Sequence, residues 1–520
     1  MMNELKKQLL DEIEEFRKVG EKFLNKELSV AEFKGASGGM GVYAERGGQK
    51  FMVRLRIPSG VTDVKELKTI YNLAEKYNLN KVHLTTRQAI QLHSMGINDV
   101  CDVMKECLDY DIFTRGAGGN YPRNVALSPL AGVDKGEVFD CTPYALAVGN
   151  HFLRKITSYH LPRKLKVSFS ATSKDEGHVT VQDLGFLAVK KDGKNGFAVY
   201  AGGGLGMNPR KAVLVEDFIE ADEVLYYVEG MTKFFIAEGD YKNKARARVR
   251  YILDRLGEEE FTRKLKEFVE LEKVNEDLNI NVEEKEIVKQ GITTQIKDNR
   301  LIAQKQPGLY SVYIHPIGGQ LELTDFKKII DFLGRVDGAD VRLALVEGLY
   351  VRNLNGEEAE ELLKITESFS ELTRLGKSIS CIGVPICQMG RCNSQHLLKN
   401  IVNYFKERNY SLDIMPRVFI SGCPNSCGVH EIGDIGFMGM KVKHEDKFKD
   451  AFRLFIDGKI EVDKTKMGIE KGDFLPEDIP IFLYKLYEKV EKSGLNFDEF
   501  IAQNTNEVND LIKEYAVNVL

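Results

Sequence analysis

The chain has 520 residues, which at roughly 150 residues per domain predicts about three or four domains. Hydrophobic residues make up 43% of it and charged residues 29%, so disordered, collagen-like and coiled-coil chains are excluded. The 73 basic and 78 acidic residues give a net charge of −5. A general polyanion-binding surface is therefore not indicated, and we expect no nucleic acid among the partners.

Local patterns predict the first elements of the chain. Residues 2–24 are expected to form a surface helix, and the glycine-rich stretch 35–41 is expected to end that region. Apolar and basic residues alternate from 51 to 57, which predicts a half-buried strand that Pro58 and Gly60 stop. A helix over 63–77, a strand at 83–85 and the segment 86–93 are expected to follow.

The same order of elements recurs in the second half of the chain. Pro58 and Pro316 lie 258 positions apart, and Arg87 and Val346 lie 259 apart. Four matches at nearly one offset predict a duplicated chain, and chance similarity among short α/β elements is the alternative. The recurring elements are a strand over 310–314, a helix over 324–333 and the segment 342–350. The other two matches join 161–163 with 415–417, 254 positions apart, and 183–186 with 434–437, 251 positions apart.

The two copies have diverged in a complementary way. The first carries cations, among them Arg87, Lys164 and Lys166, whereas the second carries cysteines. One half is thus expected to keep a basic site and the other a thiolate site. Between the copies, residues 275–300 are polar and are expected to form a connection, and residues 476–516 are expected to close the chain as helices.

The cysteines and the N-terminal segment bear on the compartment. Cys101, Cys107 and Cys141 are isolated and are expected to be structural, while the other five lie between positions 381 and 427. The chain is too long for a secreted disulfide framework and opens with a charged amphipathic segment rather than an apolar export signal. It also has no run of about 18 apolar residues. We therefore expect a cytoplasmic protein with reduced thiols and no membrane partner.

Four of these five cysteines form two pairs, Cys381 with Cys387 and Cys423 with Cys427. Four thiolates in two loops can enclose an iron–sulfur cluster, because its iron favours sulfur ligands. Zinc is the main alternative metal, although structural zinc sites usually use shorter Cys spacings than the C-x5-C of the first pair. Buried structural thiols are the third alternative. Cys392 is offset from both pairs and is expected to be a core or loop cysteine.

The segments around these cysteines resemble the siroheme-dependent sulfite and nitrite reductases. The matching residues are Ser421–Gly428 and Asp434–Gly439 beside the cysteines, and Thr85–Gln88, Pro122–Val125 and Leu161–Lys166 earlier in the chain. The resemblance implies an α/β (α+β) fold of three domains, duplicated about a pseudo-twofold axis and containing ferredoxin-like half-domains.

That resemblance also divides the chain into four segments. Residues 1–115 would hold the N-terminal helix and the first ferredoxin-like half-domain, and residues 116–275 the first siroheme-binding domain with the distal cations. Residues 300–372 would form the second half-domain, packed with the first. Residues 373–520 would form the second siroheme-binding domain, which carries the cluster cysteines.

Two cofactors are implied by the resemblance, siroheme and a four-iron four-sulfur (4Fe-4S) cluster. The cluster ligands would be Cys381, Cys387, Cys423 and Cys427, and Cys427 would also be the ligand that bridges the cluster to the siroheme iron. Siroheme carries eight carboxylates, so further basic and backbone donors are needed. The candidates are Arg163, Gly203, Gly204, Arg246, Arg250 and Asn425.

The support for these donors differs from residue to residue. Arg246 and Arg250 are expected to share one helix face, although a solvated face is the alternative for that basic run. Gly203 and Gly204 could offer backbone N–H groups to the carboxylates.

The distal cations of the family fall on Arg87, Arg123, Lys164 and Lys166, which are therefore the expected catalytic residues. Positions 164 and 166 of an extended strand point to the same face. Arginine forks suit the oxygens of small oxyanions. Crowding and partial burial are expected to lower the lysine pKa values, which favours proton delivery to the substrate.

The substrate is expected to be sulfite, reduced by six electrons to sulfide. In the family, a lysine at the position of Lys166 is typical of sulfite reductases, and the sulfite dianion gains more from an extra positive charge than nitrite does. The cysteine loop looks more like that of ferredoxin-nitrite reductases, so nitrite reduction to ammonia is the alternative.

Two further alternatives belong to other classes of protein: a related monooxygenase that makes cobalamin precursors, and a non-catalytic iron–sulfur electron-transfer protein. The four cations argue against both. No flavin or nicotinamide segment is recognisable, so electrons are expected from an external donor, either a ferredoxin or a separate reductase subunit.

Overall fold

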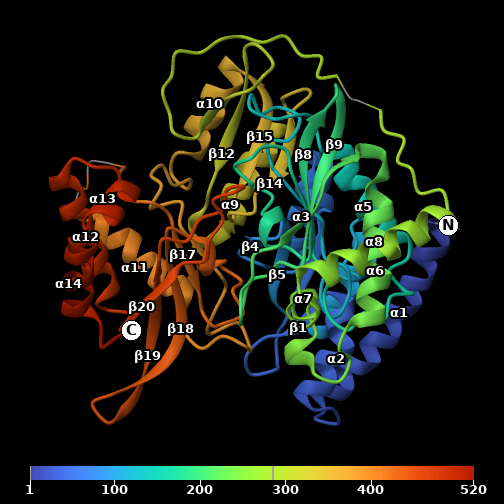
Figure 1. Ribbon diagram of the computed structural model, residues 1–520, viewed down its shortest axis with the longest axis horizontal. Coiled ribbons are helices and arrows are strands. Elements are labelled where there is room, and N and C mark those ends of the chain that lie inside the picture. The colour runs from blue at the N-terminus through green and yellow to red at the C-terminus, as the bar shows by residue number, and fades with distance from the viewer. Residues whose placement is uncertain (1, 284–285, 409, 411–412) are drawn as a thin grey trace.

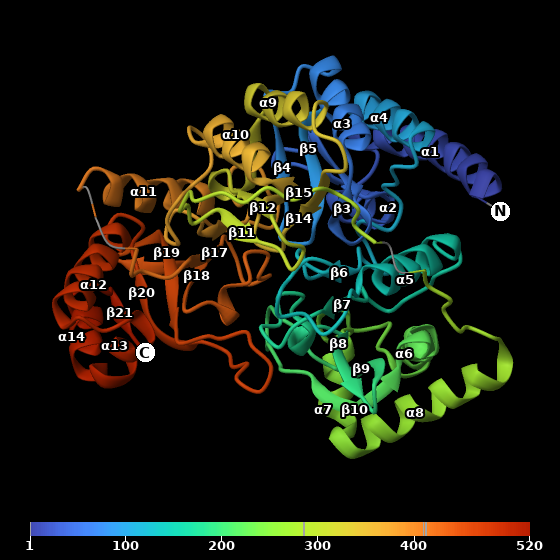
Figure 2. The same cartoon turned by 90° about the horizontal axis from the view of Figure 1, so that it is seen from above.

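The computed structural model describes residues 2–283, 286–408, 410 and 413–520. Four sheets organise this part of the chain. Figure 2 shows two sheets with short strands, built from β1 to β5 and β11 to β15, in its upper centre. The sheet of β6 to β10 lies at the lower right, and the sheet of β16 to β21 lies at the left. Among the helices of the described residues, none combines the length and the apolar character that crossing a membrane requires.

The two sheets with short strands exchange one edge strand. The first has the order β1-β2-β5-β4-β13 and the second the order β11-β12-β15-β14-β3, so each copy of the duplicated unit gives a short strand to the other. The strands of the first are β1 Val42–Ala44, β2 Phe51–Arg56, β4 Lys81–Leu84, β5 Ala89–Met95 and β13 Gln320–Glu322; those of the second are β3 Val61–Thr62, β11 Leu301–Ala303, β12 Leu309–Ile314, β14 Asp340–Leu343 and β15 Leu349–Asn355. Their helices are α1 Met2–Leu24, α2 Val30–Met40, α3 Val64–Lys76 and α4 Ile97–Asp109, then α9 Leu323–Leu333 and α10 Gly356–Thr366.

The other two sheets, called the large sheets because most of their strands are longer, share one topology, and the second of them has β21 as an additional strand. Each opens with parallel pairings, β6-β7-β8 in the first and β16-β17-β18 in the second, and continues with antiparallel strands. The first contains β6 Ala126–Leu127, β7 Val167–Ser170, β8 Leu184–Lys191, β9 Lys194–Ala201 and β10 Val213–Glu220; the second contains β16 Ile379–Ser380, β17 Val418–Ser421, β18 Ile435–His444, β19 Lys447–Ile456, β20 Ile469–Phe474 and β21 Asn518–Val519. Their helices are α5 Thr142–Arg154, α6 Val224–Glu238, α7 Val249–Leu256 and α8 Glu258–Asn275, then α11 Ser394–Lys406, α12 Ile479–Ser493, α13 Phe497–Gln503 and α14 Thr505–Tyr515.

The predicted duplication is therefore visible in the folded chain, and the predicted α/β fold with ferredoxin-like halves is confirmed. The loops that follow β7 and β17 contain equivalent hydrogen bonds. The Ser170 hydroxyl accepts from the N–H of Gly177 at 2.9 Å, and the Ser421 hydroxyl accepts from the N–H of Gly428 at 3.0 Å. Ser421 and Gly428 each lie 251 positions after their counterparts, Ser170 and Gly177. The four segment boundaries given above remain a prediction.

The glycine-rich stretch 35–41 differs from its expected role, because most of it is helical and belongs to α2. Only Gly41, with φ +81°, ends the helix. A Cβ on Gly38 would lie 3.2 Å from the backbone of Gly119, and one on Gly39 would lie 2.8 Å from the ring of Tyr121. These glycines let the helix pack closely against the loop that precedes Arg123.

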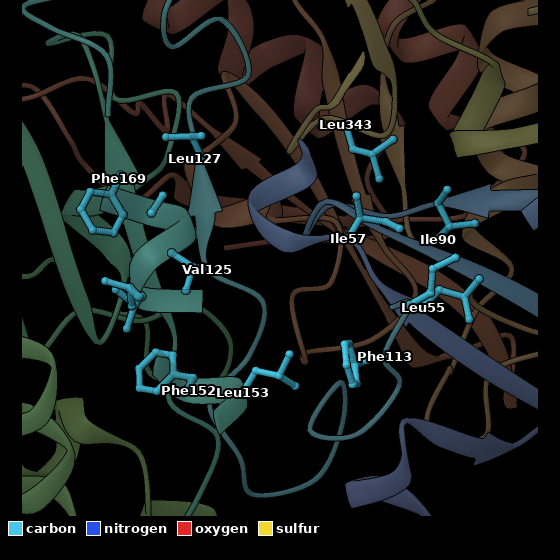
Figure 3. Close-up of a cluster of buried hydrophobic side chains, with 14 of the residues drawn as sticks. Leu55, Ile57, Ile90, Phe113, Val125, Leu127, Phe152, Leu153, Phe169 and Leu343 are labelled. Carbon is cyan, nitrogen blue, oxygen red and sulfur yellow. The ribbon is translucent and has the colours of Figure 1, made fainter. Parts of the chain in front are cut away.

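The apolar core joins the first half-domain to the first large sheet. In Figure 3, Leu55, Ile57 and Phe113 face the side chains of Phe152 and Phe169 across this junction. Each of these side chains is at least nine-tenths buried, and burying one such side chain stabilises the fold by roughly 1.5–3 kcal/mol. The C-terminal sheet and its helices enclose a separate core, which is the red and orange part of Figure 1. The two large sheets thus pack on different apolar cores. The loops at which the two sheets meet hold the candidate site residues that are described next.

Candidate active site

The four paired cysteines lie in two neighbouring loops. Cys381 and Cys387 follow β16, and Cys423 and Cys427 follow β17. Since β16 and β17 are parallel neighbours, both loops leave the same edge of the sheet. The loops touch closely, because a Cβ on Gly422 would lie 2.8 Å from the carbonyl oxygen of Cys392. The fold therefore brings both cysteine pairs together.

The thiols have surroundings that suit a cluster. The N–H of Gly422 donates to Sγ of Cys381 at 3.1 Å, a hydrogen bond that tunes cluster sulfurs in iron–sulfur proteins. Burial and then the charge of Cys427 raise the pKa values of Cys381 and Cys387. Within the described residues, no three His, Cys, Asp or Glu side chains converge on a single-ion site. The ligands of a cluster surround several atoms and need not converge on one point.

Cys392 does not belong to this group. Its side chain is fully buried, and its thiol contacts the carbonyl oxygens of Met440 at 3.1 Å and Ala451 at 3.4 Å. A core or loop cysteine was expected at this position, and the structure places it in the core. The isolated cysteines Cys101, Cys107 and Cys141 are also buried.

Arg87 and Arg123 lie in the first half of the chain and are held by backbone carbonyls. The guanidinium of Arg87 donates to the carbonyl oxygens of Asn124 at 3.1 Å and Val167 at 3.0 Å, and to Oε1 of Gln182 at 3.0 Å. Arg123 donates to the carbonyl oxygens of Ala117 and Gly119, both at 2.8 Å. These bonds fix both guanidinium groups without neutralising their charge.

Lys164 and Lys166 flank Leu165, whose side chain is fully buried and whose backbone bridges to Pro122. Burial and then the charge of Lys166 lower the pKa of Lys164 well below its usual range. Burial and then the charge of Arg87 lower the pKa of Lys166 to about 7. The expected lowering of both lysine pKa values is thus found.

The cations and the thiols meet across the two halves of the molecule. The hydroxyl of Thr86, next to Arg87, donates to the carbonyl oxygen of Cys427 at 2.8 Å. The charge of Cys427 also acts on both Lys164 and Lys166, counteracting part of the pKa lowering. Lys164 and Lys166 precede β7, whereas Cys427 follows β17. The site therefore combines residues from the N-terminal end of β7 in one large sheet with residues from the C-terminal end of β17 in the other.

Comparison with known proteins assigns the chain to a family. A family profile described as "Nitrite and sulphite reductase 4Fe-4S domain" matches residues 118–273 and 373–492, more than half of the chain. A second, described as "Nitrite/Sulfite reductase ferredoxin-like half domain", matches residues 43–110. The chain belongs to the nitrite and sulfite reductase family. It is accordingly an oxidoreductase.

Individual relatives of this family include both activities. The chain is 26% identical over 450 residues to the chloroplastic ferredoxin–nitrite reductase of Arabidopsis thaliana, covering 82% of this chain and 75% of that protein. It is also 26% identical over 423 residues to a sulfite reductase [ferredoxin] of Mycobacterium tuberculosis, covering 79% and 74%. The structure of the Mycobacterium tuberculosis NirA protein aligns with a TM-score of 0.78 at 23% identity, over 92% of this chain and 91% of that one.

The proposed siroheme donors of this reductase differ in their placement. Arg250 donates to the carbonyl oxygens of Leu205 at 3.3 Å and Met207 at 2.6 Å, and so supports the glycine-rich loop that contains Gly203 and Gly204. A Cβ on Gly204 would lie 2.7 Å from Arg250, so a side chain there would displace the guanidinium.

Arg163 and Asn425 have few contacts of their own. The only side-chain hydrogen bond found for Arg163 within the described residues is a long one, 3.4 Å, to Asn120. Asn425 is exposed, and its backbone faces Gly206 of the glycine-rich loop.

Arg246 is placed differently from its prediction. It lies exposed in a 3-10 turn, Lys244–Arg246, while α7 begins only at Val249. The expected helix face shared by Arg246 and Arg250 is therefore wrong, because the helix starts between them. Arg246 remains a proposed contact of a siroheme carboxylate, but only through an exposed side chain.

Arg248 is a further residue next to the lysines that the sequence patterns did not single out. Its guanidinium forms a buried ion pair with Asp183, with nitrogen–oxygen distances of 2.8 and 2.9 Å. Asp183 also accepts from the N–H of Lys166 at 2.8 Å. Asp183 thus orients the segment that carries both lysines. Its place in a repeated Asp-x-Gly-Phe motif was the available signal.

Proposed function

We propose that this protein reduces sulfite to sulfide with six electrons, using siroheme and a 4Fe-4S cluster that share the thiolate of Cys427. The observation that carries the proposal is an excess of positive charge on partly buried side chains, two of which, Lys164 and Lys166, feel the charge of Cys427. Within the described residues, no carboxylate forms an ion pair with any of the cations concerned. These cations are Arg87, Arg123, Arg163, Lys164 and Lys166.

The donor set fits a polyanionic cofactor. Nε of Arg123 and Nε of Arg250 are buried and have no hydrogen-bond partner in the described part of the chain, and buried polar groups normally have one. The carboxylates of siroheme would supply acceptors and negative charge here. When bound, siroheme supplies an iron that binds the substrate, and the cluster supplies electrons to it through the shared thiolate.

The lysines account for the proton demand of the reaction. Reduction of sulfite to sulfide releases three oxygens as water, so protons must reach the substrate repeatedly. Lys166, with a pKa of about 7, can hold a proton and release it near neutral pH. Arg87 and Arg123 retain their charge and can orient the oxyanion.

Nitrite is the second candidate substrate. The relatives that match at 26% identity include a nitrite reductase and a sulfite reductase. Nitrite is a monoanion of similar size and also takes up six electrons when it is reduced to ammonia. Sulfite is favoured because two lysines, not one, supply positive charge next to Cys427.

We further propose a cytoplasmic enzyme that receives electrons from a small ferredoxin-type protein. The relatives named above are ferredoxin-dependent by their printed names. In this chain, the loop of Cys387 reaches the surface at Met389, which is 53% exposed. Exposed cations, Lys34, Arg46 and Arg391, lie at or next to this loop. An acidic electron carrier fits such a surface.

The test is a visible spectrum of anaerobically purified protein, together with turnover of sulfite and of nitrite driven by a reduced dye on the same sample. Siroheme bands with faster sulfite turnover are the expected result. Siroheme bands with a strong preference for nitrite would select the second substrate. A cluster spectrum without siroheme in fully loaded protein would overturn both.

A further inference from the structure

The glycine-rich loop of the first half of the chain packs against the cysteine loop of the second half. This loop, residues 202–208, connects β9 to β10. Gly206 has φ +103°, and a Cβ on it would lie 3.6 Å from the carbonyl oxygen of Pro424 and 3.7 Å from that of Asn425. The contact therefore lies within three residues of Cys427.

One buried carboxylate joins these two loops. Glu431 is 3% exposed and lies in a 3-10 turn, His430–Ile432. The N–H of Gly206 donates to its Oε1 at 2.8 Å, and the hydroxyl of Ser426 donates to its Oε2. Nδ1 of His430 lies 3.6 Å from the same Oε2. Glu431 thus binds one loop with each oxygen.

Ser426 needs this support because of its backbone. It directly precedes Cys427 and has φ +53°, in the left-handed region that non-glycine residues rarely adopt. Such a conformation persists only where surrounding contacts determine it. The hydrogen bond to Glu431 is such a contact, so it also sets the direction in which the chain enters Cys427.

The first copy contains the same hydrogen bond with donor and acceptor exchanged. Asp175 and Thr180 lie 251 positions before Ser426 and Glu431, and Asp175 has the same left-handed backbone, with φ +54°. The hydroxyl of Thr180 donates to Oδ2 of Asp175 at 2.6 Å and also meets the hydroxyl of Thr465, in the other half, at 2.9 Å. Both copies thus reach across to the partner half at the same position, but only the second does so beside a cysteine.

We infer that Glu431 is a positioning residue that holds the loop of Cys427 against the glycine-rich loop and thereby sets where the bridging thiolate stands relative to Lys164 and Lys166 of the other half. The inference rests on the proposed function in so far as Cys427 bridges the two cofactors. The exchange of Thr180 for Glu431 between the copies supplies the reason, because the carboxylate has a second oxygen that accepts from the N–H of Gly206, whereas a hydroxyl has only one oxygen.

The experiment compares four proteins, each purified anaerobically: wild type, Glu431→Ala, Glu431→Gln and Thr465→Val. Iron and siroheme per chain, the visible spectrum, the cluster reduction potential and the melting temperature are measured. Glu431→Ala is expected to weaken cofactor retention by roughly tenfold or more, as loss of outer-shell partners does, and to change the spectrum and the potential. Glu431→Gln is expected to stay near wild type, because its amide oxygen still accepts from Gly206 and its amide nitrogen can donate to Ser426.

Thr465→Val is the matched control, because it removes the equivalent cross-half hydrogen bond, which joins Thr465 to Thr180 and not to the residue next to Cys427. It is expected to lower the melting temperature while leaving cofactor content, spectrum and potential unchanged. If Glu431→Ala does not fold, Ser426→Ala removes only the contact next to Cys427 and is expected to change the same spectrum and potential.

Two results would overturn the inference: a Glu431→Ala protein with wild-type cofactor content, spectrum and potential, or equal cofactor loss in Thr465→Val. A wild-type protein that holds iron but no siroheme would instead overturn the proposed function. In that case, the iron content and cluster potential of Glu431→Ala still test how Cys427 is positioned.

Discussion

Gln88 and Glu347 occupy the same position in the two copies of the chain, 259 residues apart. Both are fully buried or nearly so, and both have a left-handed backbone, with φ +51° and +58°. The amide of Gln88 donates to the carbonyl oxygens of Leu127 and Leu343, at 2.9 and 2.7 Å, while a carboxyl oxygen of Glu347 accepts from the N–H of Ser380 at 2.8 Å. Each therefore fastens its half-domain to a large sheet, and Glu347 does so one residue before Cys381.

Replacing Glu347 with Gln is expected to stabilise the protein above about pH 5. Burial raises the pKa of Glu347 well above its usual range, so the folded chain keeps a proton that the unfolded chain loses above about pH 4.3. Wild-type stability therefore falls as pH rises from that value toward the folded pKa. Glu347→Gln is always neutral, so its advantage over wild type should grow by up to about 1.4 kcal/mol per pH unit between pH 5 and 8. Urea unfolding of the cofactor-free protein across this range measures it.

Gln88→Glu supplies the mirror-image control for that experiment. A second buried carboxyl should make stability fall more steeply with pH than in wild type. Parallel pH profiles for wild type and Glu347→Gln would show that Glu347 is charged in the folded state.

Lys166→Met should raise stability and lower turnover together. Burial and Arg87 lower the pKa of Lys166 to about 7, whereas the unfolded value is about 10.4. The folded state thus binds fewer protons between these values, and wild-type stability should rise with pH across that window. The variant should lack this rise and melt at a higher temperature than wild type at pH 6, measured on cofactor-free protein.

The same variant tests proton delivery in the loaded enzyme. Loss of a general acid typically costs about 100- to 10,000-fold in rate, and dye-driven sulfite turnover should fall within that range. Turnover near the wild-type level would remove Lys166 from the catalytic residues. Lys166→Arg keeps the charge but not the low pKa, so it should bind sulfite and still turn over slowly.

Cys387→Ser should abolish cluster binding, while Cys392→Ala should not. Cys387 stands in the loop that faces the other paired cysteines, whereas the thiol of Cys392 contacts the carbonyl oxygens of Met440 and Ala451. Iron and acid-labile sulfide per chain give the readout. A cluster retained in Cys387→Ser, or lost in a folded Cys392→Ala, would show that the ligand set is wrong.

Charge reversal at the exposed surface of the cluster loop should impair the protein donor alone. Arg391→Glu combined with Lys34→Glu is expected to raise the KM for reduced ferredoxin about tenfold at low salt, and less at high salt, because steering by exposed charges is screened. Dye-driven turnover should be unchanged. Lys7→Glu alters an exposed cation of α1 and should leave both activities intact. Equal loss with dye and ferredoxin would place the effect in the site itself.

The sequence by itself indicated the duplication, because short segments recur at nearly one offset, and it showed the two cysteine pairs by their spacing. It also set Cys392 apart from the paired cysteines. The four distal cations were assigned by the resemblance to the family, whose motifs are short segments that can be recognised without the fold.

Only the tertiary structure decided how these residues meet. Lys164 and Lys166 precede their strand, and Cys427 follows its own, so neither copy can hold a complete site. The contact of Thr86 with Cys427, and that of Gly206 with Glu431, join residues 341 and 225 positions apart. The break between Arg246 and Arg250 also escaped the pattern, because the start of α7 is set by the packing of Val249 and Arg250 into the core. Contacts of this kind arise when two separately folded sheets are brought face to face, and no local period records which edges then touch.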